Sequence, residues 1–166
     1  FLDKLDTLIE ETYLILLRPD TVVDGLIIIF VVSIVPAMSE EVFFRGFIQR
    51  SFELRYRPIL AIVMTSAFFA AYHFNPYGMI PLFILGMYLG FAVYTTNSIF
   101  IAVILHFINN LTAILAFFIF GEEEFVNTAL SGDSFSTHLM SFFLLLLVFL
   151  SVIYFIAKYH DSLVKE

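Results

Sequence analysis

The sequence contains no cysteine and few charged residues. The absence of cysteine excludes disulfide bonds, thiolate metal sites and a cysteine nucleophile, and it leaves the redox compartment undetermined. Charged residues make up 14% of the 166 residues, against about 25% in a typical soluble domain, and hydrophobic residues make up 61%. With a mean hydropathy of +0.97, the composition is typical of an integral membrane protein.

Basic residues are scarce, and their distribution is uneven. The net charge of −7 argues against a nucleic-acid partner. The apolar composition makes the lipid bilayer the expected environment. The stretches 74–77 and 121–137 carry no Lys or Arg, and most basic residues lie in two clusters: Arg45, Arg50, Arg55 and Arg57, then Lys158 and Lys165. The positive-inside rule therefore predicts that the arginine connector, the 95–98 turn and the tail 158–166 are cytoplasmic. The loop with Glu122–Glu124 is expected on the outer side.

Five apolar runs follow an amphipathic segment. Residues 1–19 mix leucines with acids and predict an interfacial helix. Each later run is close to the roughly 20 residues that a spanning helix needs. Only helices satisfy their own backbone hydrogen bonds in lipid, so the expected fold is all-α. The runs cover residues 21–38, 59–74, 77–94, 99–120 and 138–157.

These runs predict one polytopic transmembrane helical bundle, a single domain over residues 1–166 with its membrane part at 21–157. The expected location is the cell membrane, as a multi-pass protein. Phe1 in place of Met indicates a fragment or a processed chain, and no signal peptide opens the sequence.

The stretch Glu40-Glu41-Val42-Phe43-Phe44-Arg45 stands at the end of the first apolar run. An ionisable side chain within a bilayer costs about 2.5–3.5 kcal/mol, so such groups usually face a cavity or a partner. Glu41 and Arg45 are four residues apart, so they share a helix face, with the acid before the base. We expect Arg45 to neutralise and orient Glu41, while Glu40 points elsewhere and stays free for chemistry. The alternative is a helix end that emerges into water with both acids solvated.

Few other strongly polar side chains interrupt the apolar runs, mainly His73, His106, Asn109 and Asn110. His106 and Asn110 share a helix face and could present an imidazole and an amide to one point. A carboxylate and an imidazole beside a water form a general-base arrangement, and a second imidazole with an amide can stabilise an oxyanion. Peptide-bond hydrolysis by an activated water fits this set. A divalent metal such as zinc is the alternative, with Glu40, His73 and His106 as ligands.

Two common protease patterns are missing. No H-E-x-x-H occurs, so a standard zincin site is absent, and no G-x-S-x-G frames a serine.

We interpret Gly86 and Gly90 as a helix-packing pair. Asn109 is interpreted as a residue that bonds a neighbouring helix rather than one that takes part in the chemistry.

Three motifs in order resemble the CAAX prenyl protease and bacteriocin-processing membrane proteases, the CPBP or Abi family. The family pattern is E-E-x-x-x-R, F-x-x-x-H and H-x-x-x-N on successive motif-bearing helices. Here it reads Glu40 to Arg45, Phe69 to His73, and His106 to Asn110, and the resemblance covers roughly Val35 to Leu111. The resemblance implies an intramembrane endopeptidase that acts on a peptide or protein, prenylated or membrane-embedded.

The resemblance also assigns roles to the motif residues. It implies that Glu40 and His73 activate the water, that His106 and Asn110 stabilise the oxyanion, and that Glu41 and Arg45 are orienting or structural. A metal-free glutamate mechanism is favoured, and a zinc-dependent version of the same protease is the alternative. Outside the enzyme class, the chain could be a non-enzymatic immunity or scaffold protein, or a small transporter.

One geometric condition decides whether the site forms. Counted from the cytoplasmic side, Glu40 comes early in its span, whereas His73 lies about 22 Å from Pro58 at roughly 1.5 Å per residue. The site therefore requires either that the first span continues past Glu40 or that the connector begins inside the membrane. If the helix ends at Met38 instead, the site does not form.

Overall fold

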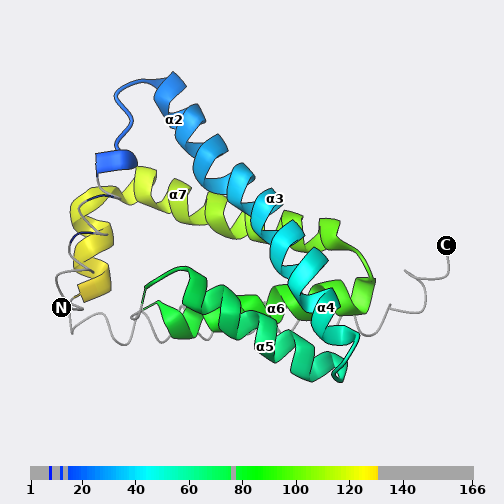
Figure 1. The fold of residues 1–166 in the computed structure, drawn as a ribbon. Coiled ribbons are helices and arrows are strands. Elements are labelled where there is room, and N and C mark those ends of the chain that lie inside the picture. The colour runs from blue at the N-terminus through cyan, green and yellow to red at the C-terminus, as the bar shows by residue number, and fades with distance from the viewer. Residues whose placement is uncertain (1–7, 9–11, 13–14, 76–77, 131–166) are drawn as a thin grey trace. The chain divides into compact units, whose positions relative to one another are not determined.

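The computed structural model describes Leu8, Thr12 and residues 15–75 and 78–130, the last eleven of these as backbone only. Every regular element within these ranges is helical, which confirms the predicted all-α class (Figure 1). The expected fifth run at 138–157, the tail at 158–166 and most of the amphipathic segment 1–19 lie outside the described residues. The chain divides into two compact units, residues 1–111 and 112–166.

The first span is one long helix made of five consecutive pieces. These are α2 (Val22–Ile29), the π-helical segment η1 (Phe30–Ile34), α3 (Val35–Glu41), the π-helical segment η2 (Val42–Gln49) and α4 (Arg50–Glu53). Together they form a 32-residue apolar helix, Val22–Glu53. The helix therefore continues past Glu40, as the site requires.

Local sequence explains where this span begins. Thr21 is the N-cap of α2: its hydroxyl accepts from Asp24 N at 3.2 Å, and its own N–H donates to the Asp24 carboxylate at 2.8 Å. This reciprocal pair satisfies two backbone donors that a helix start leaves open.

Three further helices complete the described fold. Helix α5 (Pro58–Tyr72) starts with a proline at its first turn, where a missing N–H costs nothing. Helix α6 (Met79–Thr96) ends at Asn97, whose left-handed φ of 52° is a common helix stop. Helix α7 comprises Ile99–Leu130. Helices α5 and α6 pack side by side, and η2 contacts both (Figure 1).

Two sequence expectations about the spans need correction or restriction. The fourth run was expected to end at Gly121, yet α7 continues as a helix to Leu130. A single glycine lowers helix stability by about 1 kcal/mol but does not end a helix. Among the described residues, three helices are long and apolar enough to cross a membrane: Val22–Glu53, Met79–Thr96 and the Ile99–Ile119 part of α7. The 15-residue α5 is about 22 Å long, shorter than the roughly 30 Å hydrocarbon core.

The described surface is rich in apolar side chains. On the first span alone, large hydrophobic side chains that are more than half exposed follow one another: Val22, Val23, Leu26, Ile27, Phe30 and Val31. So much exposed apolar area is unusual on a soluble monomer and suits contact with lipid.

Candidate active site

The buried centre of the site is the side chain of Glu41. Its Oε1 atom accepts from Arg45 Nη1 at 2.7 Å and lies 2.8 Å from His106 Nδ1. Glu41 and Arg45 are fully buried, and His106 is 2% exposed. The expected pairing of Glu41 with Arg45 is therefore confirmed, and His106 of α7 joins it as a third member. Because the carboxylate accepts, Nδ1 of His106 is the donor, and its Nε2 faces away from Glu41.

Arg45 is held by two further contacts. Its Nη2 donates to the carbonyl oxygen of Gly86 at 3.2 Å, and its guanidinium carbon lies 4.6 Å from the centre of the Phe69 ring. One turn along, Gln49 Nε2 donates to the Gly90 carbonyl at 3.1 Å. Two buried donors of η2 thus dock on two successive glycine carbonyls of α6.

The two glycines also bring α5 and α6 together, as their spacing predicted. A Cβ on Gly86 would lie 3.0 Å from the Cα atom of Ser66 in α5, closer than real Cβ atoms usually come. A Cβ on Gly90 would lie 2.8 Å from Gln49 Oε1 and 3.0 Å from Ile62 Cγ2.

The second acid, Glu40, faces a different imidazole. Its Oε2 lies 3.8 Å from His73 Nε2, and the two side chains are 20% and 27% exposed. His73 Nδ1 lies 2.7 Å from the Phe69 carbonyl oxygen, which can only accept, so Nδ1 carries a proton. In neutral His73 the Nε2 lone pair therefore faces Glu40. The gap is too long for a direct hydrogen bond, but one water oxygen can lie within hydrogen-bond distance of both atoms.

Phe69 lies between these two carboxylate–imidazole pairs. Its ring centre is 4.6 Å from that of His73 and 5.9 Å from that of His106, and it packs edge-on against Phe44 at 5.1 Å. With the Arg45 guanidinium over the same ring, the fully buried Phe69 contacts the side chains of all three motif regions.

Asn110 points to the first span but to a different place from His106. Its Nδ2 lies 3.4 Å from the carbonyl oxygen of Val32 in η1. The residue four positions after Val32 is Pro36, which has no N–H to give that carbonyl its α-helical bond. Asn110 therefore supplies a side-chain donor in place of the backbone N–H that the proline lacks. In this arrangement the imidazole of His106 and the amide of Asn110 do not share one partner, as their common helix face had suggested.

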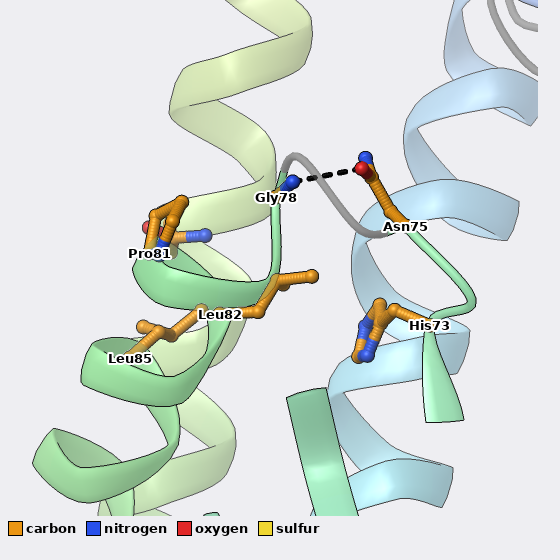
Figure 2. A pocket seen from close by; sticks show the side chains of 7 residues that line it. His73, Asn75, Gly78, Pro81, Leu82 and Leu85 are labelled. Atoms are coloured by element: carbon orange, nitrogen blue, oxygen red, sulfur yellow. Dashed lines mark hydrogen bonds between the residues drawn. The ribbon is translucent and has the colours of Figure 1, made fainter. Parts of the chain in front are cut away.

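A cavity of about 450 Å³ opens beside His73. Figure 2 shows the imidazole of His73 extending from the end of α5 towards Leu82 of α6. Asn75 follows in the turn, and its Oδ1 accepts from Gly78 N at 2.7 Å. The remaining lining residues are Pro81, Leu82, Leu85 and Asn109. Its volume falls within the roughly 300–1,000 Å³ range of small-ligand sites, and His73 connects it to Glu40.

Comparison with protein families matches residues 22–112 to the family described as type II CAAX prenyl endopeptidase Rce1-like. The match covers more than half of the chain and contains Glu40, His73, His106 and Asn110. The chain belongs to the Rce1-like family. Comparison with curated proteins and with solved structures gave no significant match.

For this Rce1-like chain, family membership supports the predicted resemblance and a general assignment as a CAAX-protease-like endopeptidase. The family and the three apolar helices together indicate a membrane protein.

The structure does not bring the three residues of the alternative metal site, Glu40, His73 and His106, together around one point. Across the described part of the chain, no three His, Asp or Glu side chains lie close enough together to hold one ion. Instead, the three candidate ligands are divided between two pairs, Glu40 with His73 and Glu41 with His106.

Sequence reasoning missed several members of this Rce1-like site. The contact of Glu41 with His106 joins residues 65 positions apart and leaves no periodic signal. Pro36 could have been noticed, because a proline within an apolar helix leaves an unpaired carbonyl four residues earlier. Asn109 was assigned to a neighbouring helix, but its Nδ2 donates to the adjacent Asn110 Oδ1 at 3.3 Å and the residue lines the cavity.

Proposed function

We propose that this chain is an intramembrane endopeptidase that hydrolyses a peptide bond with a water activated by Glu40 and His73. The observation that carries the proposal is the 3.8 Å gap between Glu40 Oε2 and His73 Nε2. His73 itself lines the cavity. Two acceptors held at this separation orient one water through its two hydrogens and leave a lone pair of its oxygen free to attack. Among the described residues, the buried Glu40 Oε2 has no hydrogen-bond partner.

In the proposed reaction, Glu40 carries one proton from the water to the leaving amine. The water oxygen attacks the scissile carbonyl carbon while Glu40 takes the water proton, and the carbonyl oxygen becomes an oxyanion. When the tetrahedral intermediate collapses, the C–N bond breaks and Glu40 returns the proton to the leaving amine. A peptide or protein substrate, prenylated as the family description implies, is the proposed partner.

His106 and Asn110 are the proposed oxyanion donors. The Nδ1–H group of His106 already donates a hydrogen bond to Glu41. The imidazole can therefore donate from Nε2 only when it carries a second proton. Asn110 Nδ2 has two hydrogens, and its contact with Val32 uses one of them. The other is free to reach the oxyanion.

Removing either water-binding group tests the proposal. In Glu40→Gln and in His73→Ala we expect cleavage of a farnesylated CAAX peptide to fall by roughly 10²–10⁴-fold, the usual contribution of a general base. Rates would be measured on purified protein in detergent, with thermal unfolding as the folding control. Full activity in a folded Glu40→Gln protein would contradict the proposal.

Metal dependence is tested on the same preparation. The glutamate mechanism predicts that a strong chelator leaves the rate unchanged and that purified active protein contains no stoichiometric metal. Loss of activity on chelation and recovery with zinc would favour the metal-dependent version instead.

A further inference from the structure

Asn109 belongs to the cavity beside His73, and it occupies a variable position of the H-x-x-x-N motif. The residue is exposed and lines the same 450 Å³ cavity as His73 and Asn75. The three polar side chains come from two places far apart in the sequence: the end of α5 and the middle of α7. A polar residue on the lipid-facing side of a spanning helix is costly, and the cavity gives the Asn109 side chain a polar neighbourhood instead.

The orientation of Asn109 is set by its neighbour. Its Nδ2 donates to Asn110 Oδ1 at 3.3 Å, and Asn110 Nδ2 in turn lies 3.4 Å from the Val32 carbonyl. This chain of contacts ends at the carbonyl that Pro36 leaves without its α-helical bond. The Asn109 carboxamide keeps one N–H hydrogen and the Oδ1 lone pairs for a ligand.

The cavity walls fit an extended peptide. A carboxamide offers a donor and an acceptor together, which matches the N–H and C=O groups of a peptide main chain. Pro81, Leu82 and Leu85 of α6 form an apolar wall on which side chains can pack (Figure 2). His73, the imidazole of the water-activating pair, lies in the same cavity.

We infer that Asn109 binds the main chain of the substrate peptide next to the scissile bond, and that Asn110 positions the Asn109 carboxamide. This inference rests on the proposed endopeptidase function. Asn109 thus contributes to substrate affinity and takes no proton in the reaction.

The test separates binding from chemistry. In Asn109→Ala, KM for an internally quenched farnesylated CAAX peptide should rise roughly three- to tenfold, the effect of one or two lost hydrogen bonds. The kcat should stay within about twofold of the parent value. In the Glu40→Gln background the same substitution should raise the Kd of the uncleaved peptide by the same factor, measured by fluorescence anisotropy.

A matched control lies on the same helix. Ile104 of α7 is 52% exposed and does not line the cavity, so Ile104→Ala should leave KM and Kd unchanged. Unchanged KM and Kd in Asn109→Ala would overturn the inference, and so would a fall in kcat at constant Kd. Cleavage by the Glu40→Gln protein would instead contradict the proposed function, because that variant retains Asn109.

Discussion

Pro36 and Asn110, which lie on two different helices, both affect the hydrogen bonding of the Val32 carbonyl. Proline removes the N–H that would bond the Val32 carbonyl, and the Asn110 amide lies 3.4 Å from that oxygen. Val32 is partly buried, and a carbonyl that lacks its backbone donor is costly there, so the amide side chain of Asn110 compensates for the proline. Asn110 thus has a structural task in addition to its proposed place in the oxyanion site.

This pairing predicts non-additive stability effects. Asn110→Leu should destabilise the parent protein more than it destabilises Pro36→Ala, because alanine restores a backbone donor for Val32. The coupling free energy should be about 1 kcal/mol, typical of one hydrogen bond, and is measured by unfolding all four proteins in detergent. Asn110→Leu combined with Thr65→Val in α5 is the control and should be additive. Additive effects of Pro36→Ala and Asn110→Leu would show that the two residues are not coupled.

Residues a few positions apart were the most predictable part of the site. The i,i+4 spacing of Glu41 and Arg45 predicted their ion pair, which the structure confirms at 2.7 Å. The contacts of His106 with Glu41 and of Arg45 with Phe69 could not be predicted, because they depend on how three helices pack. For the same reason the sequence could not show that Asn109 lies in a cavity with His73.

At the scale of the helices, η2 and α6 are joined by buried donors and glycine carbonyls. Arg45 and Gln49 donate to the carbonyls of Gly86 and Gly90. At Gly90 a Cβ would lie 2.8 Å from Gln49 Oε1, so the missing side chain makes room for Gln49. The same missing side chains let α5 approach α6 from another direction. The glycine pair therefore fixes the positions of both α5 and η2, which carry His73 and the motif arginine.

Alanine substitutions should separate close packing from helix propensity. Gly86→Ala places a Cβ 3.0 Å from the Ser66 backbone of α5, and we expect a loss of about 1–3 kcal/mol in unfolding free energy. Gly46→Ala is the control: its Cβ would meet only the tip of the Ile99 side chain, at 3.3 Å, and alanine is the better helix former. Thermal unfolding in detergent gives the comparison. Equal stabilities of the two variants would contradict a packing role for Gly86.

The helices themselves were largely predictable from hydropathy. The runs expected at 59–74, 77–94 and 99–120 correspond to α5, α6 and the first part of α7, because a chain in lipid must bond its own backbone. Helix ends were less predictable. Gly121 does not stop α7, and the two π-helical segments of the first span have no simple sequence signature.

At the scale of the whole molecule, one end of the described bundle collects the positive charge. Arg50 Nη2 donates to Asn97 Oδ1 at 2.7 Å, so the end of the first span and the turn after α6 lie at the same end. Arg55 and Arg57 are exposed in the neighbouring connector. By the positive-inside rule this end is the cytoplasmic one, which stays a prediction.

The absence of native cysteine makes this orientation easy to test. Asp20→Cys precedes the first span and Leu54→Cys follows it, and both positions are exposed. In intact spheroplasts of the expression host, a membrane-impermeant maleimide should label the Asp20→Cys variant. It should label the Leu54→Cys variant only after the membrane is opened. The cysteine-free parent gives the background. Labelling of both positions from the same side would contradict a membrane-spanning Val22–Glu53 helix.

Glu40 and Glu41 are consecutive residues, yet they face imidazoles on two different helices, α5 and α7. The same short piece of backbone therefore positions both carboxylates relative to their histidine partners. A change in the length of a connecting loop leaves the spacing of the two acids unaltered. The spacing of the two acids tolerates no such variation, since one inserted residue would turn Glu41 and everything after it by roughly 100° around the helix.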